Sequence, residues 1–100
     1  MRGVARLGDK TIGRCTCHKD PIENMPGHIV SASPDTYADH LGVARLGDII
    51  LADCGHTAKI ITSSSVSFAN QLGVARLGDL GGGACYTCKI ITASSDQVTN

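Results

Sequence analysis

The sequence has few aromatic side chains and no net charge. It contains no tryptophan, two tyrosines and one phenylalanine, and its 9 basic residues balance its 9 acidic ones. Proteins that bind nucleic acids usually present a basic surface, and those that bind single strands also stack bases on aromatic rings. We therefore expect no nucleic acid among the partners of this protein.

Long apolar runs are also missing. No stretch approaches the roughly 20 residues that a helix needs to cross a bilayer, and the N-terminus has no apolar signal-peptide segment. We expect a protein that is made in the cytoplasm and does not insert stably into membranes. With 42% hydrophobic residues and balanced charge, the 100 residues should fold as a single domain, 1–100.

Five cysteines and four histidines accompany a core that is short of bulky side chains. Small domains with thin cores are often stabilised by disulfides, a metal or a partner. An odd number of cysteines leaves one thiol unpaired, and in a reducing compartment Cys/His clusters more often bind metal than form disulfides. We expect one metal ion, zinc first and iron second, with disulfides and free thiols as the alternatives.

The strongest signal is an internal repeat. The heptapeptide Gly-Val-Ala-Arg-Leu-Gly-Asp occurs three times without change, at intervals of 39 and 31 residues. The copies span residues 3–9, 42–48 and 73–79. A segment of β-branched residues and serines follows each copy, so the chain divides into three units. These units cover about 3–41, 42–72 and 73–100.

Each unit is predicted to be β structure. Isoleucine pairs such as Ile60-Ile61 favour strands, the Gly-Asp that ends each heptapeptide favours a turn, and a short apolar strand is expected after Gly42 and Gly73. Residues 66–69 alternate apolar and polar side chains, as a half-buried strand does. No segment has a sustained helical stripe, so we predict an all-β domain with at most one short helical turn.

Cysteines and histidines gather in the segment between each heptapeptide and the following strand. In chain order these residues are Cys15, Cys17, His18, Cys54, His56, Cys85 and Cys88. If the units are related by an approximate three-fold axis, these segments converge at one place and can share one metal ion.

The repeated Val-Ala-Arg-Leu-Gly-Asp, together with the strand, turn and strand of residues 60–70, resembles the motif of the PAAR-repeat family. The resemblance covers nearly the whole chain and is closest to the standalone spike-tip proteins of T-even-type contractile-tailed phages. It implies a small pseudo-three-fold cone of three β-meander repeats with one metal ion near the vertex. Proteins of this family cap a trimeric β-helical spike, one copy per trimer, in type VI secretion systems and contractile-tailed phages.

The resemblance further implies a structural role rather than catalysis. The chain would be assembled into the spike tip of a virion baseplate or injection machine, would sharpen it, and would touch the target envelope only transiently. It also suggests a ligand set, since His56 aligns with a family histidine and Cys85 or Cys88 stands where the third repeat carries a cysteine. The candidate metal ligands are His18, Cys54, His56, Cys85 and Cys88.

Other residues receive weaker assignments. For Cys15 and Cys17 a packed or free thiol is as plausible as a metal ligand, and His28 and His40 are expected to be surface histidines. The three Arg/Asp pairs of the heptapeptides are expected to order turns.

Two alternative functions stay open. A small metal-dependent hydrolase would need a base near the metal, for which only Glu23 and Asp53 are at hand. A zinc-stapled adaptor for another partner is the other alternative.

Overall fold

The computed structural model describes residues 1–100 and is all-β, which confirms the predicted class. It contains twelve strands and no helix, and so no helix that could span a membrane. The strands are β1 (Arg2–Gly3), β2 (Lys10–Cys15), β3 (Ile22–Ile29), β4 (Tyr37–Ala38), β5 (Leu41–Gly42), β6 (Ile49–Ala52), β7 (Thr57–Ile60), β8 (Phe68–Ala69), β9 (Leu72–Gly73), β10 (Leu80–Gly82), β11 (Tyr86–Ile90) and β12 (Val98–Thr99).

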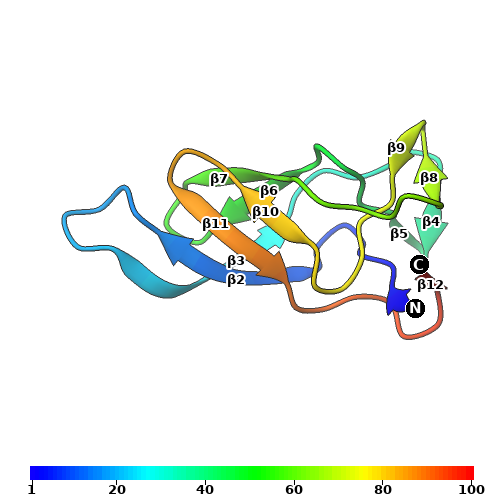
Figure 1. Ribbon diagram of the computed structural model, residues 1–100, viewed down its shortest axis with the longest axis horizontal. Helices are drawn as coiled ribbons and strands as arrows, with labels where there is room; N and C mark the ends of the chain where they lie inside the picture. Colours follow the sequence, from blue (N-terminus) through cyan, green and yellow to red (C-terminus); the bar gives the residue numbers. More distant parts are fainter.

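Six of the strands form a closed antiparallel barrel in the order β10-β11-β2-β3-β6-β7. Each repeat unit contributes one hairpin to it, namely β2–β3, β6–β7 and β10–β11 (Figure 1). Burial alternates along these strands, since inward side chains such as Ile50, Ile60 and Ile90 are at most 1% exposed. This period of two follows from the strand geometry and places one core inside the barrel.

The molecule is elongated, with extents of 39 × 22 × 22 Å. The β2–β3 hairpin projects beyond the other two hairpins at the narrow end, and both chain termini lie at the wide end (Figure 1). Near the narrow end, β3 carries an extra residue opposite β2, where Gly13 pairs with Met25 but Cys15 pairs with Ile22. Asn24 adopts a left-handed φ of 55° there, as an extra residue in a β-bulge can.

The heptapeptides form the middle of the molecule, but they are not the short strands that we predicted. Their alanines instead close a ring of three backbone hydrogen bonds, in which Ala5 N–H donates to Ala75, Ala75 to Ala44 and Ala44 to Ala5, each at 2.9 Å. All three alanines are 0% exposed. These alanines pack in the same core as the barrel isoleucines, and the flanking residues of the heptapeptides make isolated bridges rather than ladders.

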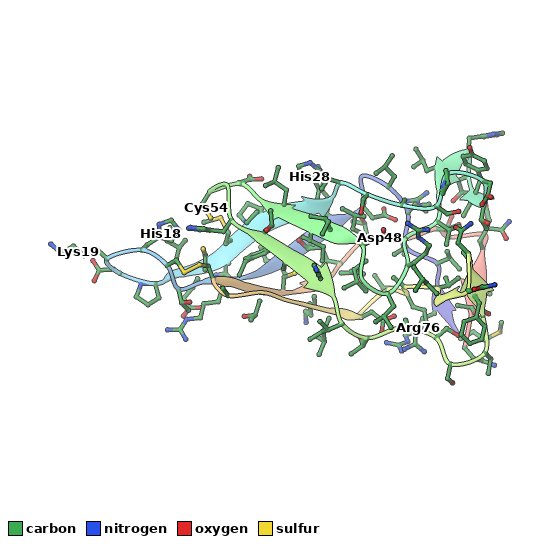
Figure 2. The ribbon with its side chains drawn as sticks, turned by 90° about the horizontal axis from the view of Figure 1, so that it is seen from above. His18, Lys19, His28, Asp48, Cys54 and Arg76 are labelled. Atoms are coloured by element: carbon green, nitrogen blue, oxygen red, sulfur yellow. A yellow bond between two sulfur atoms is a disulfide. The ribbon has the colours of Figure 1, made fainter.

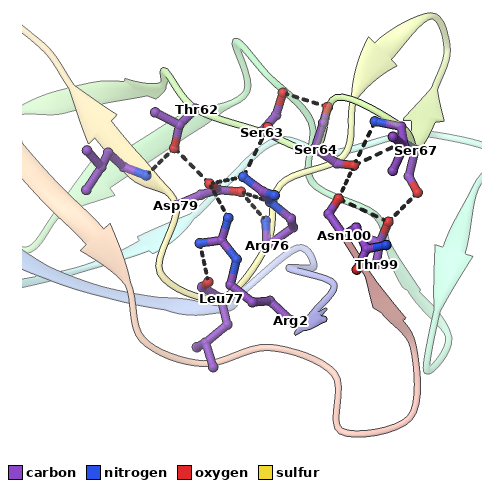
Figure 3. A network of polar contacts seen from close by, with 12 residues as sticks. Arg2, Thr62, Ser63, Ser64, Ser67, Arg76, Leu77, Asp79, Thr99 and Asn100 are labelled. Carbon is purple, nitrogen blue, oxygen red and sulfur yellow. Dashed lines mark hydrogen bonds and ion pairs between the residues drawn. The ribbon is translucent and has the colours of Figure 1, made fainter.

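Each heptapeptide also contains an Arg–Asp ion pair, as predicted. In the third copy, Arg76 donates to Asp79 through Nε and Nη2 at 2.9 Å and through its backbone N–H at 2.7 Å (Figure 3). The Thr62 hydroxyl from the preceding unit donates to Asp79 at 2.8 Å and accepts a bond from the Leu80 N–H. The same arrangement joins Ser31 to Asp48 and Thr92 to Asp9. These pairs order turns and tie one unit to the next.

At the wide end lie three two-stranded sheets, β1–β12, β4–β5 and β8–β9 (Figure 1). The strand predicted over 66–69 is reduced to Phe68–Ala69, because the Ser64 hydroxyl accepts the N–H groups of Val66 and Ser67 and bends the chain there. Val4, Val43 and Val74 form a second small core with Ala38 and Ala69 beneath these sheets.

Candidate metal centre

The β6–β7 turn brings two of the predicted ligands to the narrow end. The Ala52 carbonyl accepts the Gly55 N–H at 2.9 Å, and the Ala52 N–H donates to the His56 carbonyl at 2.8 Å. Gly55 has a φ of 96°, which makes this a three-residue turn with a left-handed glycine in its last position. Cys54 and His56 flank that glycine, so the turn sets the position of both side chains.

The end of β2 supplies the facing half of the site. Thr11, Gly13 and Cys15 point inward by strand alternation, and Cys15 is fully buried at the last position of β2. His18 follows in the loop that leads to β3, and its ring lies 5.1 Å from that of His56, at 71°. In Figure 2 His18 and Cys54 both lie at the narrow end, near Lys19 at its tip.

The four donor atoms are close enough to share an ion. Those of Cys15, His18, Cys54 and His56 all lie within 4.8 Å of one another. His56 Nδ1 is 3.0 Å from Cys15 Sγ and 3.3 Å from Cys54 Sγ, and the two sulfurs are 3.4 Å apart. A tetrahedral zinc ion with bonds of about 2.3 Å to sulfur and 2.0 Å to nitrogen separates its ligand atoms by roughly 3.3–3.8 Å. The group therefore needs only small movements to hold zinc.

His18 gives a separate indication of a ligand. Its Nε2 is the one buried side-chain nitrogen or oxygen in the protein that has no hydrogen-bond partner. A buried polar atom without a partner costs about 1–3 kcal/mol, and such atoms are rare in folded proteins. A metal ion would satisfy this nitrogen, so the residues present fit a metal with two thiolate and two imidazole ligands.

The environment of Cys15 opposes ionisation as long as no cation is near. Burial raises the pKa of the Cys15 thiol, and the neighbouring Cys54, which shares a hydrogen bond with it and would carry the same charge, raises it further. A metal ion reverses this balance, because a thiol that coordinates it loses its proton. Metal binding here should therefore release protons.

Cys85, another predicted ligand, is joined to Cys17 in a disulfide with a Cα–Cα distance of 5.1 Å. The pairing follows from the neighbouring strands, since Tyr86 faces Cys15 across β11 and β2 and the Thr16 N–H donates to the Cys85 carbonyl at 2.8 Å. In this state neither sulfur is a thiolate. The other three cysteines, Cys15, Cys54 and Cys88, are free.

Cys88, the fifth predicted ligand, lies in neither group of potential ligands. It is the middle inward residue of β11, between Tyr86 and Ile90, and is 7% exposed in the barrel core. Burial raises the pKa of its thiol. The alternation of apolar and polar residues over 86–90 predicts this inward position, a signal that the sequence reasoning did not use. Residues 11–15 give no such signal for Cys15, because the apolar Ile12 stands at the opposite position of the alternation. Of the other two histidines, His40 is exposed in a turn and His28 lies half-buried on β3.

Two comparisons with known proteins found no match. No protein-family model matches the chain, and no curated protein matches it.

Proposed function

We propose that this protein is the structural tip of a contractile injection spike, which caps and sharpens a trimeric β-helical partner. The observation that carries the proposal is the chemistry of the wide end. Tyr37 and Phe68, the first residues of β4 and β8, are each 61% exposed, and Val98, the first residue of β12, is 47% exposed. One apolar side chain from each repeat unit therefore faces solvent at the same end.

Two of these side chains, Tyr37 and Val98, line a hollow in the surface. A cavity of about 180 Å³ lies at this end, with Val4, Val43 and Val74 in its lining and Tyr37 and Val98 among its other residues. A trimeric spike ends in three equivalent strands with unpaired backbone groups. A cap with three similar apolar positions and three short sheets suits such a partner, because each face can meet one strand.

The proposal includes an approximate three-fold arrangement of the repeat units. The closed alanine ring supports it, as does the cycle in which Ser31, Thr62 and Thr92 each bind the aspartate of another unit. A single chain with such symmetry can match a trimer without using three copies of itself.

The narrow end supports a structural rather than a catalytic metal. Four protein donors fill a tetrahedral zinc ion, whereas a catalytic ion keeps one position open. A metal centre and a disulfide at a thin end would replace the apolar packing for which there is little room there. Zinc is the proposed ion, with iron second.

The test is association with the cognate trimeric spike, followed by gel filtration and native mass spectrometry. We expect one copy of this chain per trimer. Phe68→Asp should weaken binding at least tenfold, whereas Ile61→Asp, at a residue that is 55% exposed on the side of the barrel, should leave it unchanged. Absence of a complex, or equal effects of the two variants, would refute the proposed interface.

A further inference from the structure

The Cys17–Cys85 disulfide lies beside the candidate metal centre. The sulfurs of Cys17 and Cys85 and a ring nitrogen of His56 lie within 4.8 Å of one another. His56 also belongs to the group formed with Cys15, His18 and Cys54. The His56 imidazole is thus close to two pairs of cysteines. Cys17 and Cys85 form a disulfide, whereas Cys15 and Cys54 are free thiols.

This disulfide is accessible to small solutes. Cys17 is exposed and Cys85 is half-buried, whereas Cys15 is fully buried. A cavity of about 300 Å³ reaches His56 and Cys85 between β7 and the β10–β11 turn. Gly83 lines this cavity and has no side chain to narrow it; a Cβ at this position would lie 2.5 Å from the Thr57 carbonyl oxygen. A reductant or a metal ion can therefore approach the disulfide from solvent.

We propose that this disulfide is the oxidised form of a second metal-binding set, in which Cys17 and Cys85 bind a zinc ion together with His56 after reduction. The inference extends the metal binding in the proposed function and rests on it only through the shared His56. Nothing in it depends on the spike.

The chemistry requires an external two-electron reductant, such as a dithiol. The dithiol supplies two electrons and two protons, the bond between the Cys17 and Cys85 sulfurs breaks, both become thiols, and the dithiol becomes a disulfide. Zinc then binds both sulfurs and displaces their two protons. Two thiolates and one imidazole form a familiar zinc ligand set, with water in the fourth position.

The consequence is a tip whose metal-binding capacity depends on its redox state. In the oxidised protein only Cys15, His18, Cys54 and His56 can bind metal. In the reduced protein Cys17 and Cys85 add two further thiolates around the same imidazole. Metal loading in a reducing compartment could therefore differ from that after oxidation.

Two matched double variants separate the two sets, with zinc as the probe and a phosphine as a reductant that is not itself a thiol. Equilibrium dialysis with elemental analysis measures bound zinc. Cys17→Ser/Cys85→Ser should bind one zinc ion whether or not reductant is present. Cys15→Ser/Cys54→Ser should bind zinc at least tenfold more tightly after reduction than before.

The outcomes are distinguishable. If Cys15→Ser/Cys54→Ser binds zinc equally in both redox states, the second set is refuted. If Cys17→Ser/Cys85→Ser binds no zinc, the metal centre of the proposed function fails instead.

Because Cys15 is buried, its variant could fail to fold, so a measurement on the single variant Cys54→Ser, which removes one thiolate of the group that competes for His56, provides a second test. After phosphine reduction, zinc should slow alkylation of Cys17 and Cys85 by N-ethylmaleimide at least tenfold, as read by mass spectrometry of the fragments. Alkylation of Cys17 and Cys85 at the same rate with and without zinc would overturn the inference.

Discussion

Tyr86 is the one aromatic residue inside the barrel. It is 0% exposed, and its O–H donates to the Met25 carbonyl at 2.9 Å while lying 3.1 Å from the Thr11 hydroxyl. Burial is the main reason that its pKa rises to about 12. Gly27 makes room for the hydroxyl, because a Cβ at that position would lie 2.9 Å from it. Tyr86 is the largest fully buried side chain in the protein. Its hydroxyl links β11 to Thr11 on β2 and to Met25 on β3.

Tyr86→Phe should therefore lower the free energy of unfolding by about 1–3 kcal/mol, since it removes the buried O–H that donates to the Met25 carbonyl and contacts the Thr11 hydroxyl. Urea denaturation measures the change. Tyr37→Phe is the matched control, because it removes a hydrogen bond to the Pro34 carbonyl from an exposed side chain. If both variants lose the same free energy of unfolding, the buried hydrogen bonds of Tyr86 contribute no more to stability than the exposed hydrogen bond of Tyr37.

Asp79 should make stability depend on pH. Burial acts to raise its pKa, but hydrogen bonds from Arg76 and Thr62 outweigh burial and lower it. A depressed pKa in the folded state stabilises the protein above the unfolded-state pKa, about 3.9, and this contribution is lost as pH falls through the folded-state pKa. Asp79→Asn should lower the free energy of unfolding by about 2–4 kcal/mol at pH 7.

The penalty of Asp79→Asn should shrink as the wild-type carboxylate is protonated below about pH 3.9. Urea titrations at several pH values measure this convergence. The exposed Asp96→Asn should change stability by less than about 0.5 kcal/mol throughout. A penalty for Asp79→Asn that is the same at pH 7 and pH 2 would contradict the assignment.

At the scale of elements, the sequence predicted the strands better than the ligands. Isoleucine pairs and Gly-Asp turns correctly predicted β structure, but we expected strands to begin at Ile60 and Ile90, whereas β7 and β11 end there. The segments before these residues, which we expected to be loops, form the barrel hairpins. Which cysteines meet depends on the pairing of β2 with β11 and on the bulge in β3, and such long-range register has no local signal. For that reason Cys15, Cys54 and the two histidines could be recognised as candidates, but not as one group.

The β6–β7 turn offers a test of how one element positions two donors. Gly55→Ala places an alanine at a φ of 96° with no other atom within 4 Å of its Cβ, so its cost is conformational, about 1–2 kcal/mol. Gly47→Ala is matched, because Gly47 has a φ of 89° and equally open space. Both variants should lose similar stability in urea denaturation.

Only Gly55→Ala should also weaken zinc binding, because Cys54 and His56 flank this residue. Zinc affinity measured by chelator competition would show the difference. Equal affinities in the two variants would mean that the turn does not position these donors.

At the scale of the whole molecule, the two ends differ in what holds them together. Hydrogen bonds between the three identical heptapeptides, whose recurrence was visible in the sequence, stabilise the middle. A small core of valines and alanines stabilises the wide end. The narrow end contains few apolar side chains and ends in a loop at Lys19 (Figure 2). Its stability should therefore depend on the disulfide and on bound metal more than on packing.

This dependence predicts a quantitative link between zinc and folding in the oxidised protein. Because one ion binds only the folded state, each tenfold rise in free zinc above the dissociation constant should raise the free energy of unfolding by about 1.4 kcal/mol. Urea titrations in zinc buffers measure this slope. His56→Ala should abolish the slope, and His28→Ala, on β3 outside the ligand groups, should retain it. A wild-type slope near zero would show that zinc does not stabilise the fold, and twice the expected slope would require a second ion in the oxidised state.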